Sequence, residues 1–413
     1  MYQYPRLRSV EIFPLQQDGQ TMVCLRDPLN ISRTSVISIA AYFILSHLDG
    51  RHTLIDIQEA YAKRFGQLLL SQELNEFIEG LDRDYFFYNE RFLNRQNEVV
   101  EDFRRLPARP PAHAGTVYQQ DAGALEAQLE AYFHAPDGPG AAESHPRPTP
   151  KALVAPHIDF HRGGPWYAWA YRELMNSEGA DLYVLLGTSH CGGSTPFIVT
   201  PKDFETPLGL VETDKEFVRR LQEKYEADLF VDEYLHRAEH SLEFQVVFLK
   251  YIANLQSRRG SSRSFKIVPI LVSSFHDMVQ DGRLPQEEAL VGSFLRRLRH
   301  QVELESRRVC FVAGVDLAHV GAQFGDRDAI TPSFLDWVEA EDLRLIERLV
   351  ALDGPGFFHE IAKDQDRRRI CGFSPLYSLI QLLDGSRGKM LKYRQAFTPA
   401  TGSAVTFTSV VFD

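Results

Sequence analysis

Three apolar runs in the sequence each end in a histidine. Residues 151–157 lead to His157, residues 182–190 lead to His190, and residues 309–319 lead to His319. Short apolar runs of this kind are typical of buried parallel strands. Because the ligands of an open parallel sheet bind outside the carboxyl ends of its strands, we expect these imidazoles to converge on one metal or general-base site. Taken singly, each histidine also fits a hydrogen-bonded residue at the rim of the core.

Cys371 is a further candidate for chemistry at this site. It follows three arginines at residues 367–369 and precedes a predicted helix with Ser374 at its N-cap and Pro375 at its first position. Positive charge and a helix N-terminus both favour the thiolate, which is the form that binds metal. The alternative is a buried, small apolar residue, as we expect for Cys310.

Acidic residues accompany two of the histidines. Glu239 and His240 open the helix predicted before residue 265, and Asp316 stands three residues before His319. Such groups can act as acid and base or can orient imidazole ligands. The ordinary alternatives are an acid that complements the helix dipole and a structural acid at a strand end.

The bulk composition limits the class of protein. The chain has 413 residues, 44% of them hydrophobic and 24% charged, which is enough for two globular domains. A formal net charge of -11 disfavours nucleic-acid or anionic-membrane partners. The N-terminal residues 1–8 lack the apolar core of a signal peptide, and no apolar run approaches the length of a membrane span, so we expect a cytoplasmic protein. The four cysteines lack paired spacing and are treated as thiols.

Residues 1–103 are predicted to form a small module. Helices are expected over residues 30–48, from Thr53 onward and over residues 70–81, followed by an aromatic hairpin or wing over residues 85–92. Three short helices and a wing are typical of winged-helix domains, which more often bind than catalyse.

A second domain is predicted over residues 112–413, after a Pro- and Arg-containing linker at residues 104–111. It begins with an amphipathic helix over residues 122–133 and a flexible surface loop over residues 135–150, rich in Pro and Gly.

Strands and helices then alternate along this domain, and a Gly-Gly-Pro turn is expected before a helix over residues 166–175. A helix is expected over residues 375–383. The predicted strands are residues 152–156, 182–187, 265–272, 309–315 and a closing antiparallel pair, 390–397 and 403–412. The pattern predicts an α/β fold with a mostly parallel sheet covered by helices on both faces.

The N-terminal module resembles PqqD-like peptide-recognition modules. The resemblance covers residues 25–93 and rests on the order of the helices and on the LDGRHTLIDI stretch at residues 48–57. It implies that an edge strand takes up a peptide by strand addition. A DNA-binding-like winged helix or a packing module without a ligand is the alternative.

The remainder of the chain, from residue 112 to the C-terminus, resembles the Memo family, a component of the AmmeMemoRadiSam system that works beside a radical SAM enzyme and a third component. The ordered motifs that carry the resemblance are AHAG at residues 112–115 with Tyr118, APH at 155–157, LGTSH at 186–190, EHSLE at 239–243, VPILV at 268–272, DLAH at 316–319 and ICG at 370–372.

This resemblance implies a fold similar to that of class III extradiol dioxygenases. It also implies His157, His190 and Cys371 as ligands of iron or copper, with zinc a further option. His319 would be the acid/base group, and Asp316, Glu239 and His240 would line the pocket.

The chain departs from relatives of this family at two places. Asp159 and His161 follow His157 where relatives often have Ala-Gly-Tyr, and they would add an acid and a histidine to the pocket rim. Residues 373–375 are Phe-Ser-Pro where relatives can have Arg-His-Pro, which would remove one base.

Three functional hypotheses follow. The first is a metal-dependent, dioxygenase-like oxidoreductase whose N-terminal module presents a peptide or partner protein. The second is a non-catalytic adaptor of the radical SAM system, which does not need the ligand side chains. The third is a zinc hydrolase in which Glu239 or Asp316 acts as base.

Overall fold

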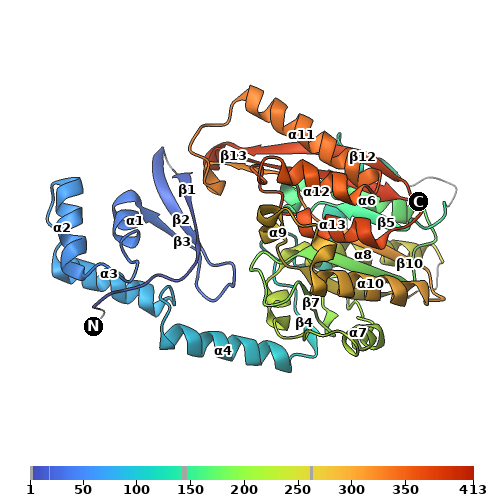
Figure 1. Ribbon diagram of the computed structural model, residues 1–413, viewed down its shortest axis with the longest axis horizontal. Helices are drawn as coiled ribbons and strands as arrows, with labels where there is room; N and C mark the ends of the chain where they lie inside the picture. The colour runs from blue at the N-terminus through green and yellow to red at the C-terminus, as the bar shows by residue number, and fades with distance from the viewer. Residues whose placement is uncertain (1–2, 18, 142–146, 261–263) are drawn as a thin grey trace. The chain divides into compact units, whose positions relative to one another are not determined.

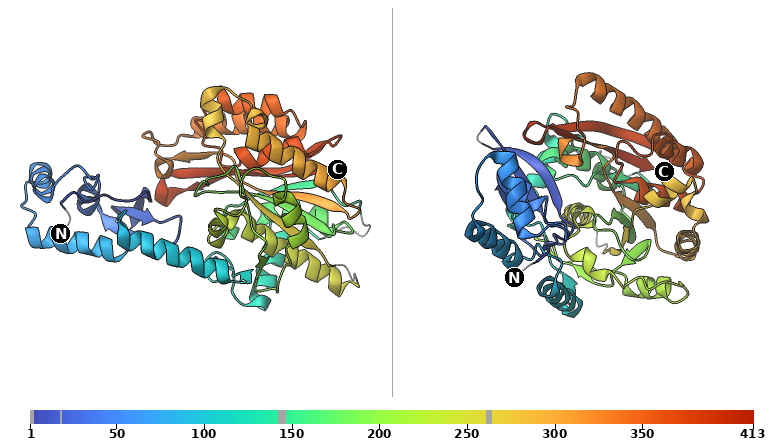
Figure 2. Two further views of the ribbon diagram at one scale, coloured as in Figure 1. Left: turned by 60° about the horizontal axis from the view of Figure 1, so that its bottom comes forward. Right: turned by 60° about the vertical axis from the view of Figure 1, so that its left-hand side comes forward.

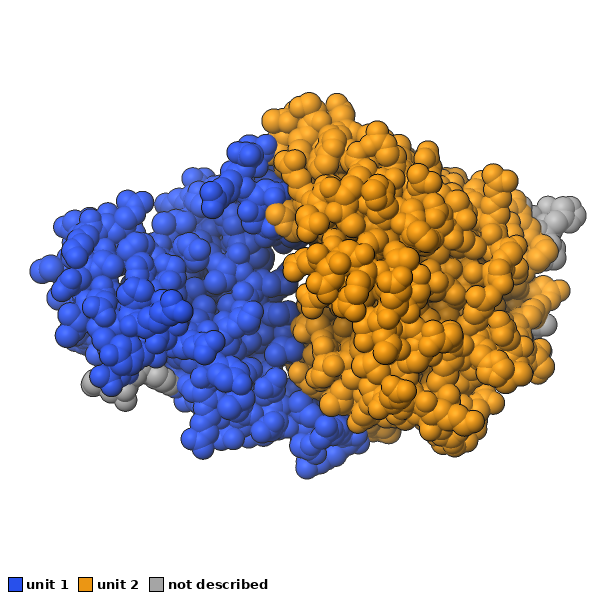
Figure 3. Space-filling model, viewed as in Figure 1, with its two compact units in different colours: residues 1–105, 321–329, 398–403 blue, residues 106–320, 330–397, 404–413 orange. Residues whose placement is uncertain are grey.

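The computed structural model describes residues 3–17, 19–141, 147–260 and 264–413. The chain forms two compact units, coloured separately in Figure 3. The N-terminal unit comprises residues 1–105, 321–329 and 398–403, and the sheet unit comprises residues 106–320, 330–397 and 404–413. No helix among the described residues is long and apolar enough to cross a membrane.

The N-terminal unit opens with an antiparallel sheet. Its strands, in spatial order, are β1 (Glu11–Gln17), β2 (Gln20–Arg26) and β3 (Ser35–Ser38). The helices that follow are α1 (Ile39–Leu45), α2 (Leu54–Phe65), α3 (Ser71–Arg83) and α4 (Glu90–Arg105). Leu25, Ile44, Ile57 and Ile78 meet in the core of this unit. Strand β1 also packs against two 3-10 turns from later in the chain, η3 (Ala322–Phe324) and η4 (Pro399–Thr401).

The predicted elements of this unit are only partly correct. The second and third helices are confirmed as α2, which Thr53 caps, and α3. The helix predicted over residues 30–48 is shorter than expected, because residues 35–38 pair with β2 as strand β3. The hairpin or wing predicted over residues 85–92 is wrong, since the described chain has no strand between α3 and α4: Phe86 and Phe87 are buried in the core, and Phe92 lies in α4.

The sheet unit is built on an eight-stranded sheet in the order β11-β13-β5-β10-β6-β9-β7, with β12 beside β13. Strands β5, β10, β6 and β9 are parallel, whereas β7 is antiparallel to β9 and β13 to β5. The strands are β5 (Ala152–Ala155), β6 (Leu182–Thr188), β7 (Phe197–Val199), β9 (Lys266–Val272), β10 (Val309–Gly314), β11 (His319–Gly321), β12 (Gly388–Thr398) and β13 (Ser403–Phe412). The predicted α/β architecture with a large central sheet is confirmed.

The register of the parallel strands brings their carboxyl ends together. Gly314 of β10 pairs with Ala155 of β5 on one side and with Gly187 of β6 on the other. The residues that follow these strands therefore emerge side by side at one edge of the sheet, as the crossover topology of parallel strands requires.

Helices lie on both faces of the sheet (Figures 1 and 2). Helices α6 (Phe160–Met175) and α8 (His240–Arg258) pack on β5, β6 and β10, and α5 (Ala122–His134) packs on α6. Helix α13 (Phe373–Leu382) packs on β6, β9 and β10, beside α10 (Ala289–Glu303) and α12 (Gly354–Ala362). The remaining helices are α7 (Lys215–Gln222), α9 (His276–Asp281) and α11 (Pro332–Val350).

Helix α8 approaches the sheet unusually closely at its first turn. A β-carbon on Gly187 would lie 2.5 Å from Ser241 Oγ, and one on Gly314 would lie 2.3 Å from the Ser241 carbonyl oxygen. Real β-carbons essentially never come so near to other atoms. Glycine at both strand ends therefore allows the start of α8 to reach the carboxyl edge of the sheet.

Several local predictions differ from the structure. The Gly-Gly-Pro sequence lies inside α6, which begins at Phe160 rather than after a turn, and α13 begins at Phe373, before the predicted Ser374 cap. The stretch at residues 104–111 contains the end of α4 and a strand, β4 (Ala108–Arg109), which pairs with β8 (Asp203–Phe204). Of the loop predicted over residues 135–150, residues 142–146 lie outside the described residues.

Candidate metal centre

Three imidazoles meet at the carboxyl edge of the sheet. His157 follows β5, His190 follows β6, and His240 is the first residue of α8. The ring centroid of His157 lies 4.9 Å from that of His190 and 5.1 Å from that of His240. The rings of His190 and His240 are stacked, with their centroids 4.7 Å apart. One ring nitrogen of each residue lies within 4.8 Å of the other two, so the three residues could hold a metal ion.

His157 is the buried member of this cluster. Its Nδ1 lies 3.1 Å from the carbonyl oxygen of Gly314, and its backbone N–H donates to Asp316 Oδ1 at 3.0 Å. Burial holds the pKa of His157 well below its ordinary value, and His190 and His240 lower the pKa further. The imidazole is therefore neutral, with a proton on Nδ1 and the basic lone pair on Nε2.

Glu239 orients the other two imidazoles. It caps α8, where its carboxylate accepts from the Ser241 N–H at 3.0 Å. The same carboxylate lies 3.0 Å from His190 Nδ1 and 3.3 Å from His240 Nδ1, and it accepts from the His190 N–H at 3.1 Å. Burial alone would raise the pKa of Glu239, but its contacts with His190, His240 and Ser241 hold the pKa well below the ordinary value.

The tautomers of all three histidines follow from these contacts. In each ring Nδ1 faces an oxygen acceptor, which favours the Nδ1–H form and leaves Nε2 as the nitrogen that can coordinate a metal. A ligand histidine that donates its other N–H to a carboxylate or a carbonyl is the common arrangement in metalloproteins. The donor set therefore fits a divalent transition metal.

Cys371 lies against the buried histidine of the cluster. Its Sγ is 3.3 Å from His157 Nε2 and 3.5 Å from the Asp316 carbonyl oxygen, and the Thr188 hydroxyl donates to the Cys371 carbonyl at 3.2 Å. Burial raises the pKa of the thiol well above its ordinary value, and the charge of Asp316 raises it further. A bound metal would have to displace the thiol proton for sulfur to become a ligand.

The expectation that three arginines make Cys371 a thiolate is wrong. Arg368 is buried in an ion pair with Asp342 at 2.6 Å, Arg367 lies over the aromatic ring of Trp337, and Arg369 donates to the His319 carbonyl at 3.3 Å. Their charges are directed elsewhere, while burial and nearby carboxylates act on the sulfur.

Asp316 and His319 have different relations to the cluster. Asp316 is buried, with Oδ2 3.7 Å from His157 Nε2, and burial raises its pKa to about 7. The Nδ1 of His319 faces the Leu317 carbonyl at 3.0 Å, and burial lowers its pKa to about 4. Asp316 therefore contacts a member of the cluster, while the ring of His319 is held by the backbone beside it.

The two proposed rim residues have local roles. Asp159 caps α6 and forms an ion pair with Arg162 at 2.6 Å, and His161 is exposed on the first turn of the same helix. Within the described ranges, no hydrogen bond or ion pair joins the side chain of Asp159 or His161 to the histidine cluster.

Sequence reasoning missed Arg109, which it left in a linker. The guanidinium is fully buried and forms an ion pair with Glu243, whose carboxylate also accepts from the Tyr118 hydroxyl and the His113 N–H. The only available signal was a single arginine between prolines, which indicated a boundary rather than a buried network.

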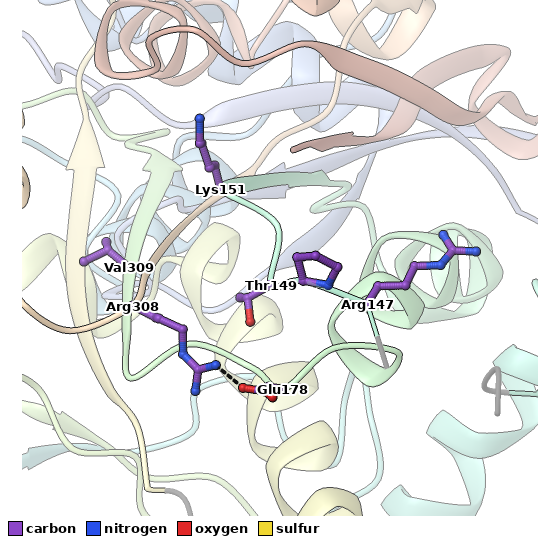
Figure 4. A pocket seen from close by; sticks show the side chains of 7 residues that line it. Arg147, Thr149, Lys151, Glu178, Arg308 and Val309 are labelled. Carbon is purple, nitrogen blue, oxygen red and sulfur yellow. Dashed lines mark hydrogen bonds and ion pairs between the residues drawn. The ribbon is translucent and has the colours of Figure 1, made fainter. Parts of the chain in front are cut away.

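A separate pocket lies at the amino ends of β5 and β10 (Figure 4). Its lining residues are Arg147, Pro148, Thr149, Lys151, Glu178, Arg308 and Val309. Arg308 forms an ion pair with Glu178, and Arg147 lies 3.5 Å from Glu173. Because acids neutralise these guanidinium groups, the pocket offers a weaker electrostatic reason for ligand binding than the histidine cluster does.

The fold and the cluster define an α/β protein with a candidate metal centre at the carboxyl edge of its central sheet. Residues 109–411 match the family model described as Memo-like protein, and the chain therefore belongs to the Memo family. It is 30% identical over 410 residues to a MEMO1 family protein of Aquifex aeolicus, a match that covers 98% of this chain and 99% of the relative.

Two other relatives show how far the similarity extends. A MEMO1 family protein of Thermus thermophilus is 27% identical, with 87% of this chain and 98% of the relative covered. One from Methanopyrus kandleri is 30% identical, with 69% of this chain and 91% of the relative covered. Since the Aquifex match covers 98% of this chain, the sequence similarity includes residues of the N-terminal unit as well as of the sheet unit.

Proposed function

We propose that this Memo-family protein is a metal-dependent redox enzyme whose centre is formed by His157, His190 and Cys371, with His240 beside them. The observation that carries the proposal is the shared orientation of three imidazoles, in which Glu239 and the Gly314 carbonyl engage Nδ1 and Nε2 is left as the donor. Hydrogen bonds to the second ring nitrogen commonly fix the tautomer and the orientation of histidines that bind a metal.

Iron and copper are the proposed metals. Imidazole nitrogen suits iron, copper and zinc, and a thiolate favours the softer ions. A redox-active ion bound at this edge would supply one-electron and dioxygen chemistry, as in the class III extradiol dioxygenases to which the family resemblance points. The chain itself would hold the ligands, keep water from the buried side of His157 and provide acid/base groups in Asp316 and His319.

Partners are proposed from the family resemblance. The protein would work with a radical SAM enzyme and the third component of the AmmeMemoRadiSam system, and the N-terminal unit would act as a PqqD-like, winged-helix peptide-recognition module. The exposed side chain of Val36 on strand β3, at the edge of the small sheet, is compatible with strand addition by a peptide.

A zinc hydrolase is the second candidate function. The observation that favours it is the three-imidazole cluster itself, because three histidines with an open position form a common catalytic zinc site. Dependence of activity on zinc but not on dioxygen would select this function over the redox enzyme.

Elemental analysis of protein purified without oxygen tests the proposal. The wild type would be compared with His190→Ala and Cys371→Ala, each checked for folding by circular dichroism. Stoichiometric iron or copper in the wild type that is lost in both variants supports the redox enzyme. If no metal is bound, or if metal content is equal in all three proteins, the site is not a metal centre and a non-catalytic adaptor becomes the better explanation.

A further inference from the structure

Arg109 contacts the turn that carries Glu239, the carboxylate that orients His190 and His240. Its Nε donates to the His236 carbonyl at 2.7 Å, and its Nη2 donates to the Glu239 carbonyl at 2.9 Å. These two carbonyls bracket the turn before α8. Because the side chain of Arg109 is completely buried, neither contact competes with water.

The remaining contacts of the guanidinium fix its position. Arg109 Nη1 donates to the Pro110 carbonyl at 3.1 Å and forms an ion pair with Glu243, and the guanidinium lies 5.2 Å from the ring centroid of Phe204. Glu243 in turn accepts from the N–H groups of Ala112 and His113. The planar fork of arginine can satisfy carbonyls and a carboxylate at once, which a lysine ammonium on a flexible stem cannot reproduce.

A second contact on the same turn comes from His113. Its Nε2 lies 3.0 Å from the Ala238 carbonyl, and its ring packs edge-on against His240 at a centroid distance of 5.9 Å. The segment that contains Arg109 and His113 therefore contacts residues 236, 238, 239 and 240 in succession.

We infer that Arg109 is a positioning residue of the metal centre, which sets the turn at residues 236–239 so that the Glu239 carboxylate meets His190 and His240. This inference rests on the proposed metal binding at the same site. The physical route is short: the guanidinium holds the Glu239 carbonyl, and the Glu239 side chain holds Nδ1 of both histidines. Loss of outer contacts of this kind commonly weakens metal affinity by about 10- to 100-fold.

Arg8 provides a matched control in the N-terminal unit. It is also buried, forms an ion pair with Asp27 at 2.5 Å, donates to the Tyr85 carbonyl at 2.7 Å and lies 4.7 Å from the ring centroid of Phe92. Replacement of either arginine by lysine keeps the charge and removes the fork. Only the Arg109 change should alter the metal centre.

The experiment is an anaerobic titration of the full-length chain with Co²⁺ against a competing chelator, followed by the visible absorption of the bound ion. We expect Arg109→Lys to bind Co²⁺ about 10- to 100-fold more weakly than the wild type, with an altered ligand-field spectrum at equal folded fraction. Arg8→Lys should keep the wild-type affinity and spectrum, whatever its effect on the thermal midpoint.

A folded Arg109→Lys protein with wild-type affinity and spectrum would overturn the inference while leaving the proposed centre intact. Failure of the wild type to bind Co²⁺ would instead overturn the proposed function, and the inference with it. If Arg109→Lys does not fold, His113→Ala decides: weaker binding with a shifted spectrum supports the inference, and unchanged binding contradicts it.

Discussion

His157, His190 and His240 enter the candidate centre from strand ends and a helix start, whereas Cys371 enters from an irregular loop. The Gly314 carbonyl faces Nδ1 of His157, and the Glu239 carboxylate faces Nδ1 of His190 and of His240. The loop before Cys371 contains three non-glycine residues with left-handed φ, namely Gln365, Asp366 and Arg369.

This loop is held by buried carboxylates. Asp366 accepts from the Ile370 N–H and pairs with His276, and Asp342 pairs with Arg368. Left-handed conformations are unfavourable for such residues, so these side-chain contacts must offset the local cost. The three histidines are therefore positioned by regular secondary structure, whereas Cys371 is positioned by a loop that ion pairs join to α9 and α11.

The largest expected effect is on the free energy of unfolding and concerns the buried ion pair between Arg368, in the loop before Cys371, and Asp342. Arg368→Met leaves the carboxylate of Asp342 buried without its cation, which should lower the free energy of unfolding by about 3–5 kcal/mol. Urea unfolding monitored by circular dichroism measures the change. Arg344→Met, on the exposed face of α11 where Arg344 pairs with Glu341, should cost no more than about 1 kcal/mol. Equal costs for both variants would contradict the view that the loop depends on a buried pair.

The next effect is on metal affinity and concerns His157, which contacts both Cys371 and His190. His157→Ala removes the imidazole that contacts Cys371 Sγ and packs edge-on against His190, so metal affinity should fall by at least about 100-fold. Competition with a chelator provides the measurement, and His300→Ala, on the exposed end of α10, is the control. A His157→Ala protein that retains stoichiometric metal would show that the ligands lie elsewhere.

A smaller effect is expected from a change that concerns the histidines alone. Glu239→Gln replaces an acceptor for two Nδ1–H groups by an amide that can accept only through its oxygen, and metal affinity should fall by about 10- to 100-fold. The same titration measures this loss. Affinity equal to that of the wild type would mean that Glu239 serves only as the cap of α8.

The smallest effect is a pH dependence in the loop before Cys371. Hydrogen bonding to Asp366 raises the pKa of His276, so the protonated pair stabilises the folded chain most fully below the unfolded pKa of about 6.5. The contribution is lost as pH rises through the raised, folded-state pKa. His276 is 42% exposed, so His276→Ala should cost less than about 1 kcal/mol at pH 6 and less again at pH 9. A cost that increases with pH in thermal unfolding would contradict this assignment.

Two of the three histidines of the candidate centre could be predicted from the sequence. The parallel strands and the positions of His157 and His190 could be predicted, because an apolar run of several residues indicates a buried strand and the polar residue after it marks the strand's end. His240 was assigned only an orienting or acid/base role, since a helix start gives no indication of which strand ends it meets.

Other features depend on contacts between distant residues. The protonated state of Cys371 reflects burial and the carboxylate of Asp316, 55 residues away, rather than the adjacent arginines. Arg109 makes its contacts with residues about 130 positions later in the chain. The β1–β2 pairing was likewise not predicted, because its strands lack a strong alternation of apolar and polar residues.

The two glycines at the carboxyl ends of β6 and β10 impose a tolerance on any redesign of this centre. A methyl group added at Gly187 would lie 2.5 Å from the Ser241 hydroxyl oxygen, whereas one added at Gly314 would lie 2.3 Å from the Ser241 carbonyl oxygen. Because the second contact is with backbone, its relief requires a shift of the first turn of α8. Glu239 and His240 would move with it, while His157 and His190 stayed on their strands. The distance between the histidine of α8 and those that follow the strands thus depends on the absence of side chains at Gly187 and Gly314. A metal-ligand side chain can therefore be replaced with less effect on this distance than either glycine can.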